Sequence, residues 1–136
     1  MGSFTNDAEN TILDAVFSAA SLGAPATYYV RLTSTLPTDS AAGTEVTTSS
    51  WTNYAPVAVT NNATNFPAAS AGAKSNGTAI SFGTATVTGA NVTVAGAELW
   101  SASSGGTRWG WSAATATVAN GAVVSIAIGA LTISLD

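Results

Sequence analysis

The 136-residue chain contains neither cysteine nor histidine. Without cysteine it can form neither a disulfide framework nor a thiolate metal site. Without histidine it lacks the side chain that most often serves as a general base or a metal ligand near neutral pH. These two absences remove the commonest nucleophilic and metal-dependent chemistries. We therefore predict that the protein is not an enzyme, and we expect no cofactor, no metal and no catalytic residue.

Charged side chains are also scarce, since they make up 7% of the residues where about a quarter is usual. Three cations, Arg31, Lys74 and Arg108, stand against seven carboxylates, and the formal net charge is −4. Because so few scattered cations cannot neutralise a row of phosphates, we expect no nucleic acid partner. A surface this poor in charge is at risk of aggregation when it is exposed. Much of it is therefore expected to be covered by other protein subunits.

No apolar run approaches the roughly 20 residues that a membrane-spanning helix needs, and the N-terminus lacks the basic start of a signal peptide. We expect no membrane partner. Outside the N-terminal region, Glu45 and Glu98 are the carboxylates that could serve glycoside hydrolysis as a pair. The alternative, in which Glu98 faces solvent or pairs with Arg108 across a hairpin, is favoured because nothing in the sequence brings a second acid near it.

The spacing near the N-terminus predicts an amphipathic helix over residues 7–22. Asn6 or Thr5 can cap it, and Glu9 lies three residues after Asn6, which is capping-box spacing. Gly23 marks its end. Apolar residues recur at helical spacing at Ile12, Leu13, Val16, Phe17 and Ala20. This stripe is expected to pack on the sheet of the same chain, with docking on a neighbouring subunit as the alternative.

Residues 91–111 predict a central β-hairpin, because two alternating apolar runs flank a polar, glycine-rich turn at residues 101–106. It holds three of the four tryptophans, and each can bury on the order of 200 Å². We therefore expect the hairpin to anchor much of the core. The Asn120-Gly121 pair predicts a second hairpin.

Further alternating segments are separated by turn residues, at 28–33, 54–60, 78–82 and 131–135. One helix followed by short strands at regular spacing is typical of a β-sandwich or barrel. The prediction is a mainly β fold: a single antiparallel β-sandwich or barrel-like domain over residues 1–136, with seven to nine short strands and one N-terminal amphipathic α-helix.

Residues 40–53 form a long polar segment in which Trp51 is the only large apolar side chain. Trp51 is either a lid on the core or an exposed anchor for a partner. Because so little apolar surface cannot offset the entropy of ordering, the segment is predicted to be mobile in the isolated protein and ordered in an assembly. Four residues are candidates for partner contacts: Trp51, Tyr54, Phe4 and Arg31.

Several longer motifs carry a resemblance to a known family. They are the helix with Asn10, Leu13, Asp14 and Phe17, then residues 29–32 with 37–39, 54–67, 74–77, 104–106 and 129–136. The segment VTNNATNFP at 59–67 and the ending GALTISLD at 129–136 are the most specific. With these motifs the chain resembles a family of small virion proteins of tailed bacteriophages, often labelled tail fibre proteins and in some phages serving as capsid decoration (cement) proteins.

The resemblance implies a virion structural protein made in the host cytoplasm. The first hypothesis is a decoration protein on the capsid surface, with the major capsid protein and copies of itself as partners. A trimer or a related cluster is then expected, because symmetric arrays favour closed oligomers. The alternative is a tail or tail-fibre component that contacts host glycan, with sugars stacked on an exposed Trp51, Tyr28 or Tyr54.

Overall fold

The structure, a computed structural model, describes residues 2–135. This part of the chain forms one helix and nine strands. In chain order they are β1 (Gly2–Ser3), α1 (Asn6–Phe17), β2 (Thr27–Thr33), β3 (Val57–Thr60), β4 (Ala73–Ser75), β5 (Ile80–Thr84), β6 (Val92–Trp100), β7 (Arg108–Val118), β8 (Val123–Ile126) and β9 (Thr132–Ser134). The mainly β fold with one N-terminal helix is confirmed.

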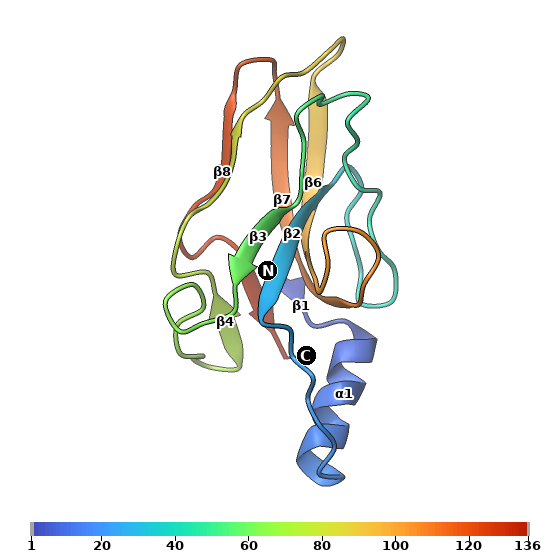
Figure 1. Ribbon diagram of the computed structural model, residues 1–136, viewed down its shortest axis with the longest axis vertical. Coiled ribbons are helices and arrows are strands. Elements are labelled where there is room, and N and C mark those ends of the chain that lie inside the picture. Colours follow the sequence, from blue (N-terminus) through green and yellow to red (C-terminus); the bar gives the residue numbers. More distant parts are fainter. Residues whose placement is uncertain (1, 136) are drawn as a thin grey trace.

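The strands lie in three open sheets that pack as a β-sandwich, so the sandwich form of the prediction holds (Figure 1). The largest sheet has the order β3-β2-β6-β7, and smaller sheets pair β1-β9-β4 and β5-β8. All pairs are antiparallel except β1 with β9, which is parallel. The wholly antiparallel arrangement that we predicted is therefore wrong at this one pair, where the start and the end of the chain lie side by side.

The central hairpin of the prediction is confirmed as strands β6 and β7, the two longest, which pair from Val92 with Val118 to Trp100 with Arg108. Its strands supply buried core residues, among them Val94, Ala97 and Leu99, but the expectation that all three of its tryptophans anchor the core is wrong. Of its tryptophans only Trp109 is buried, whereas Trp100 and Trp111 are partly exposed, and the one fully buried tryptophan is Trp51.

The turn at Asn120-Gly121 does not close a second hairpin. Strand β7 belongs to the large sheet, whereas β8 pairs with β5. The Asn120 side-chain oxygen accepts a hydrogen bond from the Val87 N–H at 3.0 Å, and the Gly121 N–H donates to the Ala85 carbonyl at 2.8 Å. These bonds tie the turn to the segment after β5, so the chain crosses from one sheet to the other.

Of the two predicted caps, Thr5 and Asn6, helix α1 uses Thr5, so the capping box from Asn6 to Glu9 does not form. Thr5 is the N-cap, and its hydroxyl accepts a hydrogen bond from the Ala8 N–H at 3.2 Å. Ala8 therefore takes the third helical position, which Glu9 would need to occupy in a capping box. The two acids Asp7 and Glu9 do lie in the first turn, where they favour the positive end of the helix dipole.

The helix ends at Phe17 rather than at residue 22. Ala19 adopts a φ of 51°, in the left-handed region that terminates helices. The N–H groups on either side of it both donate to the carbonyl of Asp14, at 2.9 and 3.3 Å. The helix is thus closed by local backbone bonds before the glycine that we expected to stop it.

The segment 40–53 is anchored within the chain itself. The Val46 N–H donates to the Leu32 carbonyl at 2.9 Å, and Trp51 forms a bridge with Val87. Trp51 is 0% exposed, so it is the lid on the core. The premise that the segment has too little to hold it without a partner is therefore wrong.

Candidate interaction surface

Helix α1 projects from one end of the β body (Figure 1). Much of its apolar face is exposed to solvent. Near its start the Thr5 hydroxyl donates to the Arg108 carbonyl at 2.8 Å, and Ala8 is buried. Further along, Leu13 is 53%, Val16 67% and Phe17 81% exposed. The expectation that the predicted stripe packs on the same chain's sheet holds only at Ile12, which is partly buried, and is wrong for these three residues. We call Leu13, Val16 and Phe17 the helix tip.

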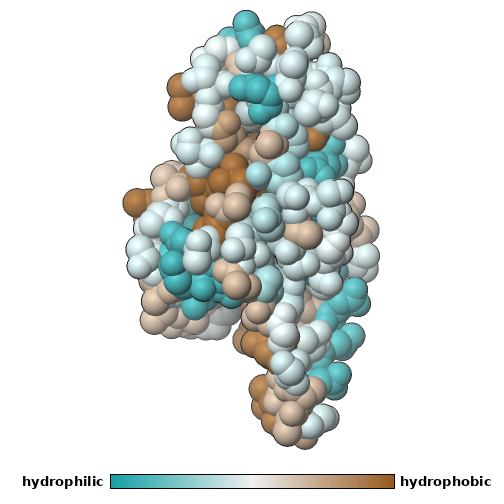
Figure 2. Space-filling view, in the orientation of Figure 1, coloured by the Kyte–Doolittle hydropathy of each residue, from teal (hydrophilic) through white to brown (hydrophobic). Residues whose placement is uncertain are grey.

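An apolar groove of about 240 Å³ lies where the helix and the segment after it meet the β body. Ile12 and Leu22 form one wall, and the other wall comes from the body. Apolar residues also gather on the projecting end of the molecule (Figure 2). The remaining lining residues are Phe4, Ala24, Tyr28, Asn61, Phe66, Lys74, Leu99, Trp109, Gly110, Leu131 and Ile133.

Tyr28 is the central aromatic residue of the groove. Its ring meets those of Phe66 and Trp109 edge to face, at centroid distances of 5.8 and 6.3 Å. Partial burial raises the pKa of its hydroxyl. Lys74 is the one cationic side chain in the lining; it is exposed, and the described structure gives it no ion pair. The groove therefore combines a rigid aromatic floor with one positive charge.

Two of the four residues predicted to contact partners, Trp51 and Tyr54, lie in the core, so this prediction is wrong for both. Their ring centroids are 5.4 Å apart, and Tyr54 is only 8% exposed. The Tyr54 hydroxyl accepts from the Leu32 N–H at 2.9 Å and donates to a Glu45 oxygen at 3.2 Å. Burial raises the pKa of Tyr54 well above its usual value. Both side chains therefore hold the segment 40–53 in place.

Arg31, the third candidate, is also buried, and its charge is used inside the chain. It donates to the carbonyls of Ala102 and Gly105, each at 2.7 Å, which fixes the loop between β6 and β7. It forms an ion pair with Glu45 at 3.7 Å and lies 4.2 Å from the ring centroid of Trp100. The prediction of a partner contact is therefore wrong for Arg31.

The fourth candidate, Phe4, is partly exposed and lines the groove. It is therefore the one member of the predicted set that lies on the candidate surface. The helix tip, Tyr28 and Lys74 were not identified from the sequence as partner contacts. One signal was present: residues 18–26 are mostly alanine, serine and glycine, which are too small to cover the apolar face of a helix.

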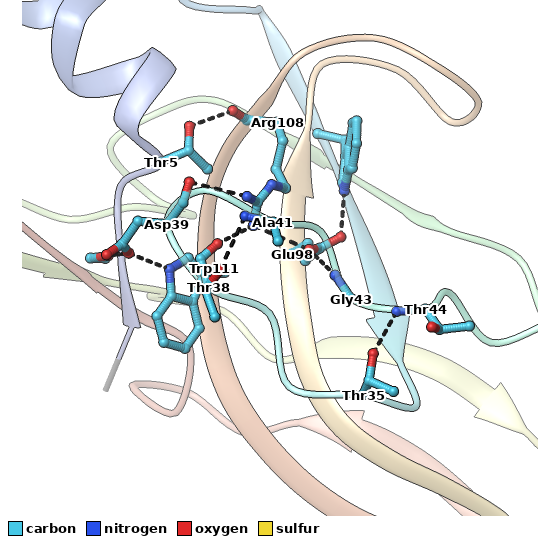
Figure 3. A network of polar contacts seen from close by, with 12 residues as sticks. Thr5, Thr35, Thr38, Asp39, Ala41, Gly43, Thr44, Glu98, Arg108 and Trp111 are labelled. Carbon is cyan, nitrogen blue, oxygen red and sulfur yellow. Dashed lines mark hydrogen bonds and ion pairs between the residues drawn. The ribbon is translucent and has the colours of Figure 1, made fainter.

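Glu98 lies at the centre of a buried polar network and is 2% exposed (Figure 3). Its carboxylate accepts from the Gly43 N–H and the Trp100 indole N–H, each at 2.9 Å, and pairs with Arg108 at 3.3 Å. The predicted pairing with Arg108 is confirmed, although the side chain faces inward. Arg108 also donates to the carbonyls of Thr38, at 2.8 Å, and Asp39, at 3.1 Å. The network fastens the segment after β2 to the central hairpin.

Within residues 2–135 no three acidic side chains gather as metal ligands would, and no helix there is long and apolar enough to cross a bilayer.

Asp39 connects the N-terminal strand to β7. Its carboxylate accepts hydrogen bonds from the Ser3 hydroxyl and from the Trp111 indole N–H, the latter at 2.8 Å (Figure 3). The bond from Ser3, and then that from Trp111, lowers the pKa of Asp39. The ionised carboxylate therefore stabilises the folded state fully at pH values above about 3.9, the pKa of an aspartate in the unfolded chain.

Replacement of Asp39 with asparagine is expected to lower the melting temperature by a few degrees at pH 7, because solvent screens this partly exposed group. The contribution of Asp39 disappears as the pH falls through its lowered folded pKa, so the difference between wild type and variant should shrink near pH 2.5. Thermal melts at both pH values measure it. Asp14→Asn, on the exposed face of α1, is the control, and an equal difference at both pH values would contradict the prediction.

The model of the family described as Podophage GP4 fiber I protein gp80 matches residues 3–134. The chain belongs to this family. Among curated protein sequences no significant match is found.

The family match covers α1, the groove and the Glu98 network. It confirms the resemblance to virion proteins of tailed phages. This gp80-family chain is therefore a phage virion structural protein. Its family indicates a location in the virion.

Proposed function

We propose that the chain is a structural subunit of a phage tail fibre, present in several copies and without catalytic turnover. The description of its family, which names a fibre protein, is the single observation that carries this proposal. The projecting helix supports it, because an exposed apolar tip next to an apolar groove is suited to contacts between subunits. The Glu98 network also fits a structural role, since its carboxylate joins Gly43 of the segment after β2 to Trp100 and Arg108 of the central hairpin.

Capsid decoration, with the major capsid protein as partner, is the second candidate. A charge-poor β surface supports it, because many weak contacts in a lattice give high avidity. Contact with host glycan is not part of the proposal. Of the three aromatic residues expected to stack on sugars, Trp51 and Tyr54 are buried, and Tyr28 is partly exposed in the apolar groove.

Fractionation of disrupted phage particles tests the location. Heads and tails of the phage that encodes this chain are separated on a density gradient, and the chain is quantified in each fraction by mass spectrometry. The major capsid protein serves as the marker of the head fraction. We expect the chain in the tail fraction, free of that marker. Recovery with heads alone would overturn the fibre role in favour of capsid decoration.

A further inference from the structure

The helix tip brings three exposed large apolar side chains together on one protruding element. Large hydrophobic residues with high exposure also occur at Leu36, Val123, Ile128 and Leu135, but these lie on separate segments. Single exposed apolar residues are ordinary, whereas a contiguous group on a protruding element marks a contact with another molecule. The helix tip therefore needs a partner.

The charges on the helix and in the groove are complementary. Segment 6–22 carries three carboxylates and no cation. Of the three cations in the chain, Arg31 and Arg108 are paired internally, and Lys74 lines the groove without a described ion pair. Asp14, exposed and next to Leu13 in the sequence, can bring a negative charge to the rim of an apolar contact. The same chain thus carries an apolar helix tip beside an acidic residue and an apolar groove beside a basic residue.

The helix tip does not lie in the groove of its own chain, because none of its three residues lines that groove. Ile12 already forms part of the groove wall. Phe17 lies five positions further along, which turns it about 140° around the helix axis at 3.6 residues per turn. A helix that keeps Ile12 in the wall therefore points Phe17 away from the same groove.

We propose that the helix tip of one copy occupies the apolar groove of a second copy of this chain. Phe17 would enter beside Tyr28 and Trp109, and Asp14 would lie near Lys74. Because the helix tip and the groove are different surfaces, the assembly of copies closes either as a reciprocal pair or as a ring. This inference deepens the proposed function by naming the neighbouring subunit, and its relevance to the particle rests on that function.

Sedimentation velocity of the purified full chain over a range of concentrations tests the contact directly. We expect reversible self-association, weakened at least about tenfold by Phe17→Ser. Phe17 is the last residue of the helix and largely exposed, so folding should be unaffected, which circular dichroism checks. Leu36→Ser, at another exposed apolar residue, is the matched control and should associate as wild type does.

Charge reversal tests the pairing of Asp14 with Lys74. Asp14→Lys and Lys74→Asp are each expected to weaken association several-fold, and the double variant should restore it, since the pair is then reversed and not lost. Association that is no better in the double variant than in the single variants would overturn the proposed register.

Because the chain has no cysteine, a disulfide can be used to trap the contact. Asp14→Cys and Lys74→Cys proteins, mixed and oxidised, should form a mixed disulfide, whereas Asp14→Cys with Val123→Cys should not. A wild-type protein that stays monomeric at all concentrations, or association that Phe17→Ser leaves intact, would overturn the inference. If the monomeric protein still enters tails, and Phe17→Ser blocks that entry, the helix tip binds a different virion protein and the proposed function stands.

Discussion

Replacing Trp51 with alanine is expected to lower the free energy of unfolding by about 3 to 5 kcal/mol, the usual cost of truncating a large buried aromatic side chain. Trp51 is 0% exposed, and its ring centroid lies 5.4 Å from that of Tyr54 and 6.3 Å from that of Phe82. Tyr54 is held by its hydrogen bonds to Leu32 and Glu45, and Phe82 lies on the separate strand β5. They cannot move together to fill the space, so a cavity should remain.

The same side chain also connects segment 40–53 to the opposite part of the sandwich. The backbone of Trp51 forms an isolated antiparallel β-bridge with that of Val87. The indole N–H of Trp51 donates to the Asn53 side-chain oxygen at 2.8 Å. That oxygen also accepts from the Thr86 N–H at 2.8 Å, so it keeps a partner when the indole is removed. The loss on truncation should therefore come mainly from packing.

Urea unfolding followed by circular dichroism measures the effect. Trp51→Phe keeps an aromatic ring and should cost clearly less than Trp51→Ala, which separates packing volume from the mere change of residue. Leu36→Ala, at an exposed position, is the control and should stay within about 0.5 kcal/mol of wild type. A loss below about 1 kcal/mol for Trp51→Ala would contradict the buried position of this side chain.

The parts of the fold that could be predicted from the sequence are those set by neighbouring residues. The alternation in 91–111 predicts β6, β7 and the turn between them, and the hairpin register brings Glu98 and Arg108 within reach. The helix start follows from a cap and a periodic apolar run, both of which are local. These features need no knowledge of distant segments.

The errors arise where a distant segment decides the outcome. Trp51 lies in a polar stretch, and its burial depends on Val87 and Phe82, which a local pattern cannot bring to it. Asn120-Gly121 has the composition of a hairpin turn, but its bonds to the segment after β5 direct the chain into the other sheet.

The candidate interaction surface could not be predicted for the same reason. An amphipathic helix has the same sequence pattern whether its apolar face meets its own sheet or a second chain. In this chain the body covers the helix near Ala8, and Phe17 extends beyond it. Where the body ends is a property of the tertiary structure.

Removing the positive charge of Arg108 while keeping much of its bulk, as in Arg108→Met, is expected to destabilise the protein by about 3 to 5 kcal/mol, the usual cost of breaking a buried ion pair. Glu98 is 2% exposed, and Arg108 is the one cation that pairs with it in the described structure. A carboxylate left buried without its counter-charge cannot recover its lost hydration. The Thr38 carbonyl loses the guanidinium nitrogen that also donates to Glu98, and the Asp39 carbonyl loses the other terminal nitrogen.

A second substitution separates the buried charge from these other losses. Glu98→Gln keeps an oxygen that can accept from Gly43, but it carries no charge. The double variant Glu98→Gln with Arg108→Met should therefore be more stable than Arg108→Met alone, because no uncompensated charge remains buried. Urea unfolding of the wild type, both single variants and the double variant completes the thermodynamic cycle. Strictly additive losses would mean that the ion pair contributes nothing beyond the separate hydrogen bonds, and the network would then owe its stability to the backbone contacts of Arg108.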